Sequence, residues 1–150
     1  MRELAMLAQK FRDAIDTAKN DGRFVKDQDF REFPKRCCGV ASELLGRYLS
    51  TYGYSVRHIG GTYHNNMQPH AWLEVDEHII IDITGDQFES HPKPLENKVP
   101  VYVGKHIDYY DLFEIEHDDV CSDQYPLKDI HIHSYMTEKE LYNIILEYIE

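Results

Sequence analysis

The spacing of apolar residues predicts three helices. Apolar positions recur every three or four residues in 3–19, in 38–52 and in the stretch that follows Thr137. Thr137 also has capping-box spacing to Glu140, which marks the start of the last helix. The apolar stripe of 38–52 is the widest of the three, so we expect this helix to be central and packed on a sheet.

The chain between the second and third helices is typical of strands. Apolar runs bounded by turn residues predict strands at 54–59, 70–75, 78–84 and 99–103. The polar segments 62–69 and 85–98 are expected to be loops, and 104–130 fits no single element. Because the strands follow one another instead of alternating with helices, the order favours an α+β domain with an antiparallel sheet, formed by residues 1–150 as one unit.

Composition and charge exclude several classes. With 42% hydrophobic residues the chain can bury a core, and it has no apolar run long enough to cross a membrane. The charged N-terminus lacks the features of a secretory signal, so a cytoplasmic location is expected. The net charge of −11 disfavours nucleic acid as a partner and would favour a basic one. The acids gathered late in the chain are interpreted as a solvated face, with an acidic docking patch as the alternative: Asp108, Asp111, Glu114, Glu116, Asp118 and Asp119.

Three cysteines in a chain without a secretory signal do not suggest a disulfide framework. Cys38 opens the second predicted helix, where free backbone N–H groups stabilise a thiolate, and Lys35 and Arg36 precede it. Cys38 is therefore the candidate nucleophile, with Cys37 as the packing residue behind it. The alternatives are that Cys37 is the nucleophile, or that both thiols are buried apolar residues.

A histidine and an aspartate on successive predicted strands complete a possible triad. His70 opens one strand, and Asp82 lies in the apolar run of the next, where a carboxylate needs a partner. A thiol nucleophile needs a base, and the base needs an acceptor that orients it. The two side chains share a face if Glu74 lies opposite His78 and residues 75–77 form the turn; this register is predicted.

Several short motifs, in this order, resemble the papain-like and transglutaminase-like cysteine enzymes, and within that group small bacterial domains. The matching residues are Phe33-Pro34, Cys37-Cys38-Gly39, Ser42, His70–Glu74 and Ile81–Phe88. The resemblance implies a helix carrying the cysteine packed on an antiparallel sheet. It also implies a Cys-His-Asp triad: Cys38 attacks an amide or ester carbonyl, His70 transfers the proton, and Asp82 orients His70.

The resemblance leaves the oxyanion donors partly open. The Cys38 backbone N–H is one expected donor. Papain-like proteases place a glutamine a few residues before the cysteine, but this chain has Glu32 there. The remaining glutamine candidates are Gln28 and Gln87. The expected activity is therefore hydrolysis, deamidation or transamidation of an amide in a peptide or protein, without a cofactor or metal.

Two other classes remain as alternatives. Nine histidines raise the possibility of a zinc site, at His131 and His133 on one face of a strand or at His117 and Cys121. Four further histidines are interpreted as surface residues, namely His58, His64, His91 and His106. The third class is an inactive protein-binding module of the same fold, in which Tyr109-Tyr110 forms either a binding face or the back wall of the core.

Overall fold

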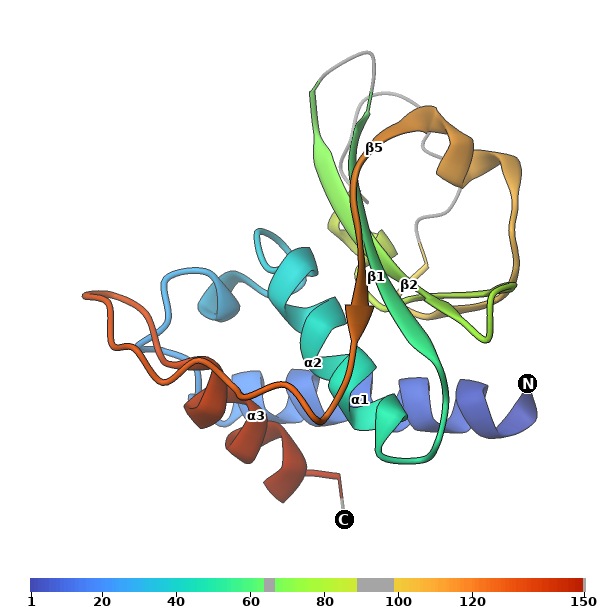
Figure 1. The fold of residues 1–150 in the computed structure, drawn as a ribbon. Coiled ribbons are helices and arrows are strands. Elements are labelled where there is room, and N and C mark those ends of the chain that lie inside the picture. The colour runs from blue at the N-terminus through green and yellow to red at the C-terminus, as the bar shows by residue number, and fades with distance from the viewer. Residues whose placement is uncertain (64–66, 89–98, 150) are drawn as a thin grey trace.

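The structure is a computed structural model that describes residues 1–63, 67–88 and 99–149. In these ranges it is an α+β fold with three α-helices and a five-stranded antiparallel sheet (Figure 1). The helices are α1 (Arg2–Asn20), α2 (Cys38–Ser50) and α3 (Glu138–Glu147). The strands are β1 (Val56–Tyr63), β2 (Pro69–Val75), β3 (Ile79–Asp82), β4 (Tyr102–Lys105) and β5 (Phe113–Cys121), in the spatial order β4-β3-β2-β1-β5. None of the helices in these ranges has the length and apolarity needed to cross a membrane.

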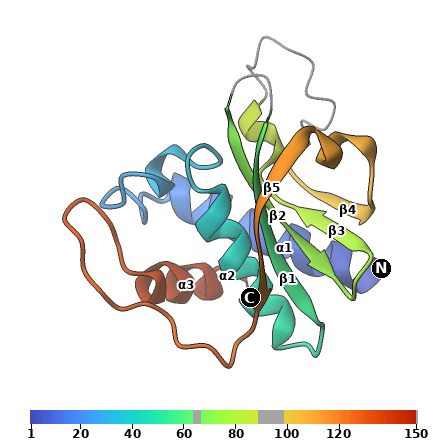
Figure 2. The ribbon, with the colours of Figure 1, turned by 45° about the horizontal axis from the view of Figure 1, so that its top comes forward.

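The α2 helix is central, as its wide apolar stripe predicts. It packs against β1 and β2, and α1 and α3 pack against it (Figure 2). Its side chains Leu44, Leu45 and Leu49 are fully buried in the main core. Tyr52, which the sequence analysis includes in this helix, is instead exposed beyond its end at Ser50. The burial of this helix against two strands fixes its N-terminal residue relative to the sheet.

The α3 helix confirms the predicted capping box. The Thr137 hydroxyl accepts from the Glu140 backbone N–H, and the Glu140 carboxylate accepts from the Thr137 N–H, each at 3.0 Å. Two of the N–H groups that a helix start leaves unpaired are thereby satisfied. Leu141 and Ile145 on the following turns are buried in the main core.

Strand β1 runs through the two glycines at which the predicted strand ends. The pairing of β1 with β5 shifts register between Gly60 and Gly61, which is a β-bulge. A Cβ atom on Gly60 would lie 2.0 Å from the His117 ring, and one on Gly61 would lie 2.5 Å from the Glu114 carbonyl oxygen. The glycines thus permit a close strand approach, and residues 62, 63 and 69 belong to strands instead of the predicted loop.

The predicted hairpin between β2 and β3 has the right faces but the wrong pairing. Val75 lies opposite Ile79 and Glu74 opposite Ile80, so the loop is 76–78 and not 75–77. Val75 is fully buried in the core, which is why it remains in the strand. Asp76 and Glu77 take the left-handed conformations of the loop, with φ of 51° and 71°. Because the shift is two residues and the side-chain period is two, His70 and Asp82 still share a face.

Residues 104–130, which fit no element in sequence, contain a short 3-10 helix at Asp108–Leu112 and the edge strand β5. The 3-10 helix and the start of β5 contribute to a second, aromatic cluster on the face of the sheet opposite to α2. The buried members of this aromatic cluster are Ile59, Tyr63, Trp72, Ile80, Tyr109, Tyr110 and Phe113. The Tyr109-Tyr110 pair is thus a back wall of the core, while the six clustered acids predicted as a solvated face are all exposed. Strand β4 begins at Tyr102, three residues later than the predicted strand.

Candidate functional site

Cys38 is the first residue of α2, and its backbone N–H has no acceptor within the helix. Its side chain is partly exposed, whereas Cys37 is buried in the main core. Burial raises the pKa of the Cys37 thiol well above its usual range. The structure therefore separates the two neighbouring cysteines as the sequence predicts: Cys37 packs in the core and Cys38 borders a cavity.

His70, at the start of β2, lies within the aromatic cluster and is 2% exposed. Its ring centroid is 5.5 Å from that of Phe113 and 5.7 Å from that of Trp72. Its Nε2 atom lies 2.7 Å from Oδ2 of Asp82, which confirms the predicted contact between the two strands. The aromatic rings hold the imidazole in one orientation and exclude water from the pair.

Asp82, at the end of β3, is fully buried and has partners for both carboxylate oxygens. Oδ2 accepts hydrogen bonds from His70 and from the Tyr110 hydroxyl, the latter at 2.9 Å. Oδ1 accepts from the Thr84 backbone N–H at 3.1 Å. These donors offset the cost of burying a carboxylate. The role of Tyr110 is not predicted from sequence, because nothing in its local sequence separates a hydrogen-bonding tyrosine from a packing one.

Cys38 and His70 shift each other's pKa. Burial opposes ionisation of the Cys38 thiol, but hydrogen bonding and charge attraction from His70 outweigh it, so the thiol pKa is lowered. Burial likewise disfavours the His70 cation, but attraction to Asp82 and hydrogen bonding to Asp82 and Cys38 raise the His70 pKa to about 9. The two shifts therefore act in the same direction, toward a thiolate beside an imidazolium.

Gln87, one of the glutamines considered from sequence, is the one that reaches the pair. Its Nε2 lies 2.8 Å from Nδ1 of His70, and its amide also hydrogen-bonds to the Cys38 thiol and lowers the thiol pKa. Nδ1 can accept from this amide only while it carries no proton. Once Nδ1 takes the thiol proton, the Gln87 amide is free to donate to the sulfur or to an oxygen beside it.

Gln87 is positioned by a buried guanidinium on α1. Arg12 donates to both carboxylate oxygens of Asp86, at 2.8 and 2.7 Å, and to the Ile83 carbonyl at 2.8 Å. Asp86 precedes Gln87 in the short helix Gly85–Phe88, and Ile83 follows Asp82. Arg12 is 5% exposed and stands 4.8 Å over the Phe33 ring. One side chain therefore fixes the segment that carries both Asp82 and Gln87.

Ser42 forms a hydrogen bond between α2 and β2 on the other side of the site. Its buried hydroxyl, one turn after Cys38, donates to the Ala71 carbonyl at 3.3 Å. Ala71 follows His70 on β2. The bond joins the helix that carries the cysteine to the strand that carries the histidine.

The neighbouring tyrosines 109 and 110 give a matched test of this network. The Tyr109 hydroxyl is buried and has no hydrogen-bond partner in the described ranges. We expect Tyr109→Phe to raise the free energy of unfolding by about 1 kcal/mol, because it removes an unpaired buried group. We expect Tyr110→Phe to lower it by about 1.5–3 kcal/mol, because a hydrogen bond to a charged carboxylate is lost. Urea unfolding measures both, and equal losses would show that the Tyr109 hydroxyl also has a partner.

The zinc candidates do not come together. His117 and Cys121 lie on β5, where four residues span about 13 Å, too far for both to bind one ion. His131 and His133 lie in an irregular segment instead of the predicted strand. Among the described residues no group of three or more His, Cys, Asp or Glu side chains is arranged to hold a metal.

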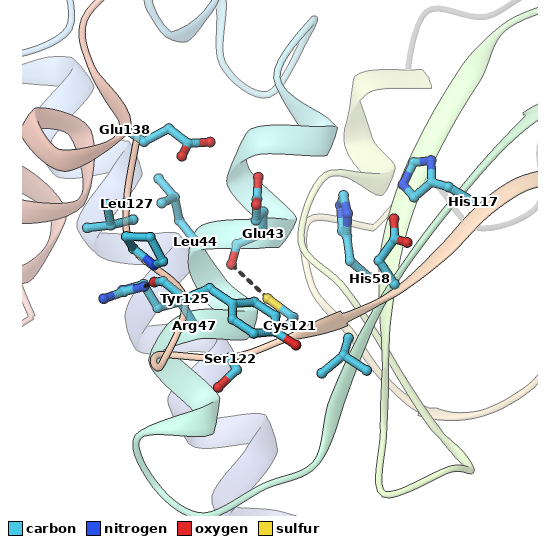
Figure 3. A pocket seen from close by; sticks show the side chains of 13 residues that line it. Glu43, Leu44, Arg47, His58, His117, Cys121, Ser122, Tyr125, Leu127 and Glu138 are labelled. Atoms are coloured by element: carbon cyan, nitrogen blue, oxygen red, sulfur yellow. Dashed lines mark hydrogen bonds between the residues drawn. The ribbon is translucent and has the colours of Figure 1, made fainter. Parts of the chain in front are cut away.

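A second cavity, of about 280 Å³, lies between α2, the end of β5 and residues 122–127 (Figure 3). Cys121 on its wall donates from Sγ to the Glu43 carbonyl, and burial raises the Cys121 thiol pKa to about 12. His58, predicted as a surface residue, is half-buried here, and burial lowers its pKa to about 4. It is therefore neutral at pH 7.

Of the other histidines predicted at the surface, His106 is exposed, which confirms the prediction. His64 and His91 lie outside the described residues.

Comparisons with known proteins do not assign the chain to a family. Neither the protein-family models, nor the curated proteins, nor the solved structures give a significant match.

Proposed function

We propose that the chain is a thiol-dependent acyl-transfer enzyme of the papain-like or transglutaminase-like kind, with Cys38, His70 and Asp82 as its triad. The observation that carries the proposal is the continuous hydrogen-bonded chain from the Cys38 thiol through His70 to a fully buried Asp82. Its thiol end borders a cavity of about 340 Å³. A structural histidine pair would not need a cavity-lining cysteine of lowered thiol pKa at its end.

In the proposed reaction, Nδ1 of His70 takes the Cys38 proton and the thiolate attacks the carbonyl carbon of an amide. The carbonyl π electrons move to oxygen, and this oxyanion is bound by the Cys38 backbone N–H and the Gln87 amide. The imidazolium then protonates the leaving nitrogen as the C–N bond breaks, which leaves an acyl thioester on Cys38. Asp82 stabilises the imidazolium through Nε2 throughout. Water or an amine then gives a proton to His70 and attacks the thioester carbon, and the C–S bond breaks to return the Cys38 thiolate.

The test is a search for the thioester and its acceptor. We would incubate the protein with a mixture of glutamine-containing peptides, with and without a fluorescent primary amine, and record the mass of the protein and of the products. Hydrolysis shortens a peptide, deamidation adds about 1 Da, and transamidation attaches the amine. The matched controls are Cys38→Ser, which should be inactive, and Cys37→Ser, which should retain activity. Equal product from the wild type and Cys38→Ser would overturn the proposal.

The Gln87 amide gives a second, more specific prediction. We expect Gln87→Ala to lower kcat by about 100-fold or more with little change in KM, because an oxyanion donor acts mainly in the transition state. Gln68, which borders the same cavity, is the matched control for loss of an amide. Steady-state kinetics on whichever peptide is accepted distinguishes the two. A larger effect on KM than on kcat in Gln87→Ala would show that Gln87 binds the substrate instead.

A further inference from the structure

The cavity at Cys38 has a charge opposite to that of the whole chain. Its lining residues are Lys35, Arg36, Cys38, Gln68, Pro69 and Gln87. Of the lining residues that the structure describes, two are cationic and none is acidic, although the net charge of the chain is −11. Lys35 and Arg36 are both exposed, so their charged groups are available to a bound molecule.

Two of the acids close to this cavity are engaged elsewhere. Asp82 lies behind His70 and is fully buried, and Asp86 is paired with Arg12 through two hydrogen bonds. Asp29 is near enough to Arg36 to interact with it electrostatically, but it forms no ion pair with it. In the described part of the chain neither Lys35 nor Arg36 has a carboxylate within ion-pair distance. The charged side chains that border the cavity are therefore two cations, while His70 and the buried Asp82 act on the Cys38 sulfur from behind.

We infer that the acyl substrate carries a carboxylate next to the carbonyl that Cys38 attacks, and that Lys35 and Arg36 bind it. The inference rests on the proposed function and specifies its substrate class. Lys35 and Arg36 lie three and two residues before Cys38 and border the same cavity, so the carboxylate belongs within about two residues of the scissile amide, at about 3.5 Å per residue. The group is an Asp or Glu side chain or a chain-terminal carboxylate. The net negative charge disfavours a strongly acidic protein, so the specificity is for a local acid and not for overall charge.

Two alkylating reagents of similar size and different charge test the local potential without a substrate. Iodoacetate is anionic and iodoacetamide is neutral, and the ratio of their rates at Cys38 reports the field at the sulfur. We expect the ratio to fall three- to tenfold in the double variant Lys35→Gln/Arg36→Gln. The matched control is Arg2→Gln/Lys10→Gln, which removes the same charge from exposed positions of α1 and should leave the ratio unchanged. The difference should shrink at 1 M salt, where charges are screened within about 3 Å.

The outcomes separate this inference from the proposed function. An unchanged ratio at a reactive Cys38 would overturn the substrate class while the triad stands. A Cys38 that reacts with neither reagent would overturn both. For an accepted peptide, we expect replacement of the neighbouring Glu by Gln to lower kcat/KM in the wild type by about the same factor and to have no effect in Lys35→Gln/Arg36→Gln. A second peptide keeps the Glu and carries an amidated C-terminus. Whichever of the two peptides loses activity identifies the carboxylate that is bound.

Discussion

Replacing His70 with alanine is expected to slow alkylation of Cys38 at pH 6 by about 100-fold, because each unit by which the thiol pKa rises costs about a factor of ten in thiolate. The lowered pKa of Cys38 depends on hydrogen bonding and charge from His70, and burial of the sulfur opposes it. Without the imidazole only the opposing effect remains. Iodoacetamide labelling followed by peptide mass spectrometry measures the rate at each cysteine separately.

The chain provides internal controls for this measurement. Cys37 and Cys121 are buried and their thiol pKa values are raised, so both should react slowly in the wild type and in His70→Ala. His106→Ala removes an exposed histidine that hydrogen-bonds to Asp111 and lies beside the Tyr110 ring, and it should leave Cys38 unchanged. If Cys38 titrates like a free thiol in both wild type and His70→Ala, the thiolate–imidazolium pair does not exist.

The two pKa shifts also predict different pH profiles for alkylation and for acyl transfer. Alkylation needs only the thiolate, so its rate should rise through the lowered pKa of Cys38 and then stay level. Acyl transfer also needs the proton on His70, so its rate should fall again as the pH passes about 9. A plateau in the first profile and a bell in the second, measured on the same preparation, would assign the alkaline limb to His70. An acyl-transfer rate that stays level above pH 9 would contradict that role.

The parts of the site that local sequence determines are predictable, and the parts that depend on residues far apart in the chain are not. The α2 helix and the shared face of His70 and Asp82 follow from local periodicity. A register error of two residues leaves every side chain of a strand on the same face, so the predicted face holds although the predicted pairing does not. The edge strand β5 leaves no such pattern, because seven of its nine residues are exposed and only its ends are buried. The bulge at Gly60-Gly61 is likewise set by β5 packing beside β1. These features depend on pairing partners 50 or more residues apart, which a single sequence does not reveal.

The largest expected loss of stability belongs to Arg12, which nothing in the local sequence distinguishes from a surface arginine. Arg12→Met should lower the free energy of unfolding by about 3–5 kcal/mol, because it leaves the shielded Asp86 carboxylate without its partner. Its polar contacts are to residues 71 to 88 positions away, apart from Asp16 on the same helix. The double variant Arg12→Met/Asp86→Leu should recover part of the loss, since it removes the unpaired charge. Urea unfolding of the three proteins measures this.

The same substitution at Arg23 is the control, because the exposed Arg23–Glu147 pair should contribute less than about 1 kcal/mol. A loss at Arg12 no larger than at Arg23 would show that the buried pair is not important for stability. The double variant also separates stability from positioning. If it folds well but Cys38 no longer shows its lowered pKa, Arg12 acts on the site through the segment that holds Asp82 and Gln87. If the Cys38 pKa is unchanged, the guanidinium stabilises the fold without tuning the thiol, and packing around η2 (Gly85–Phe88) suffices to place Gln87.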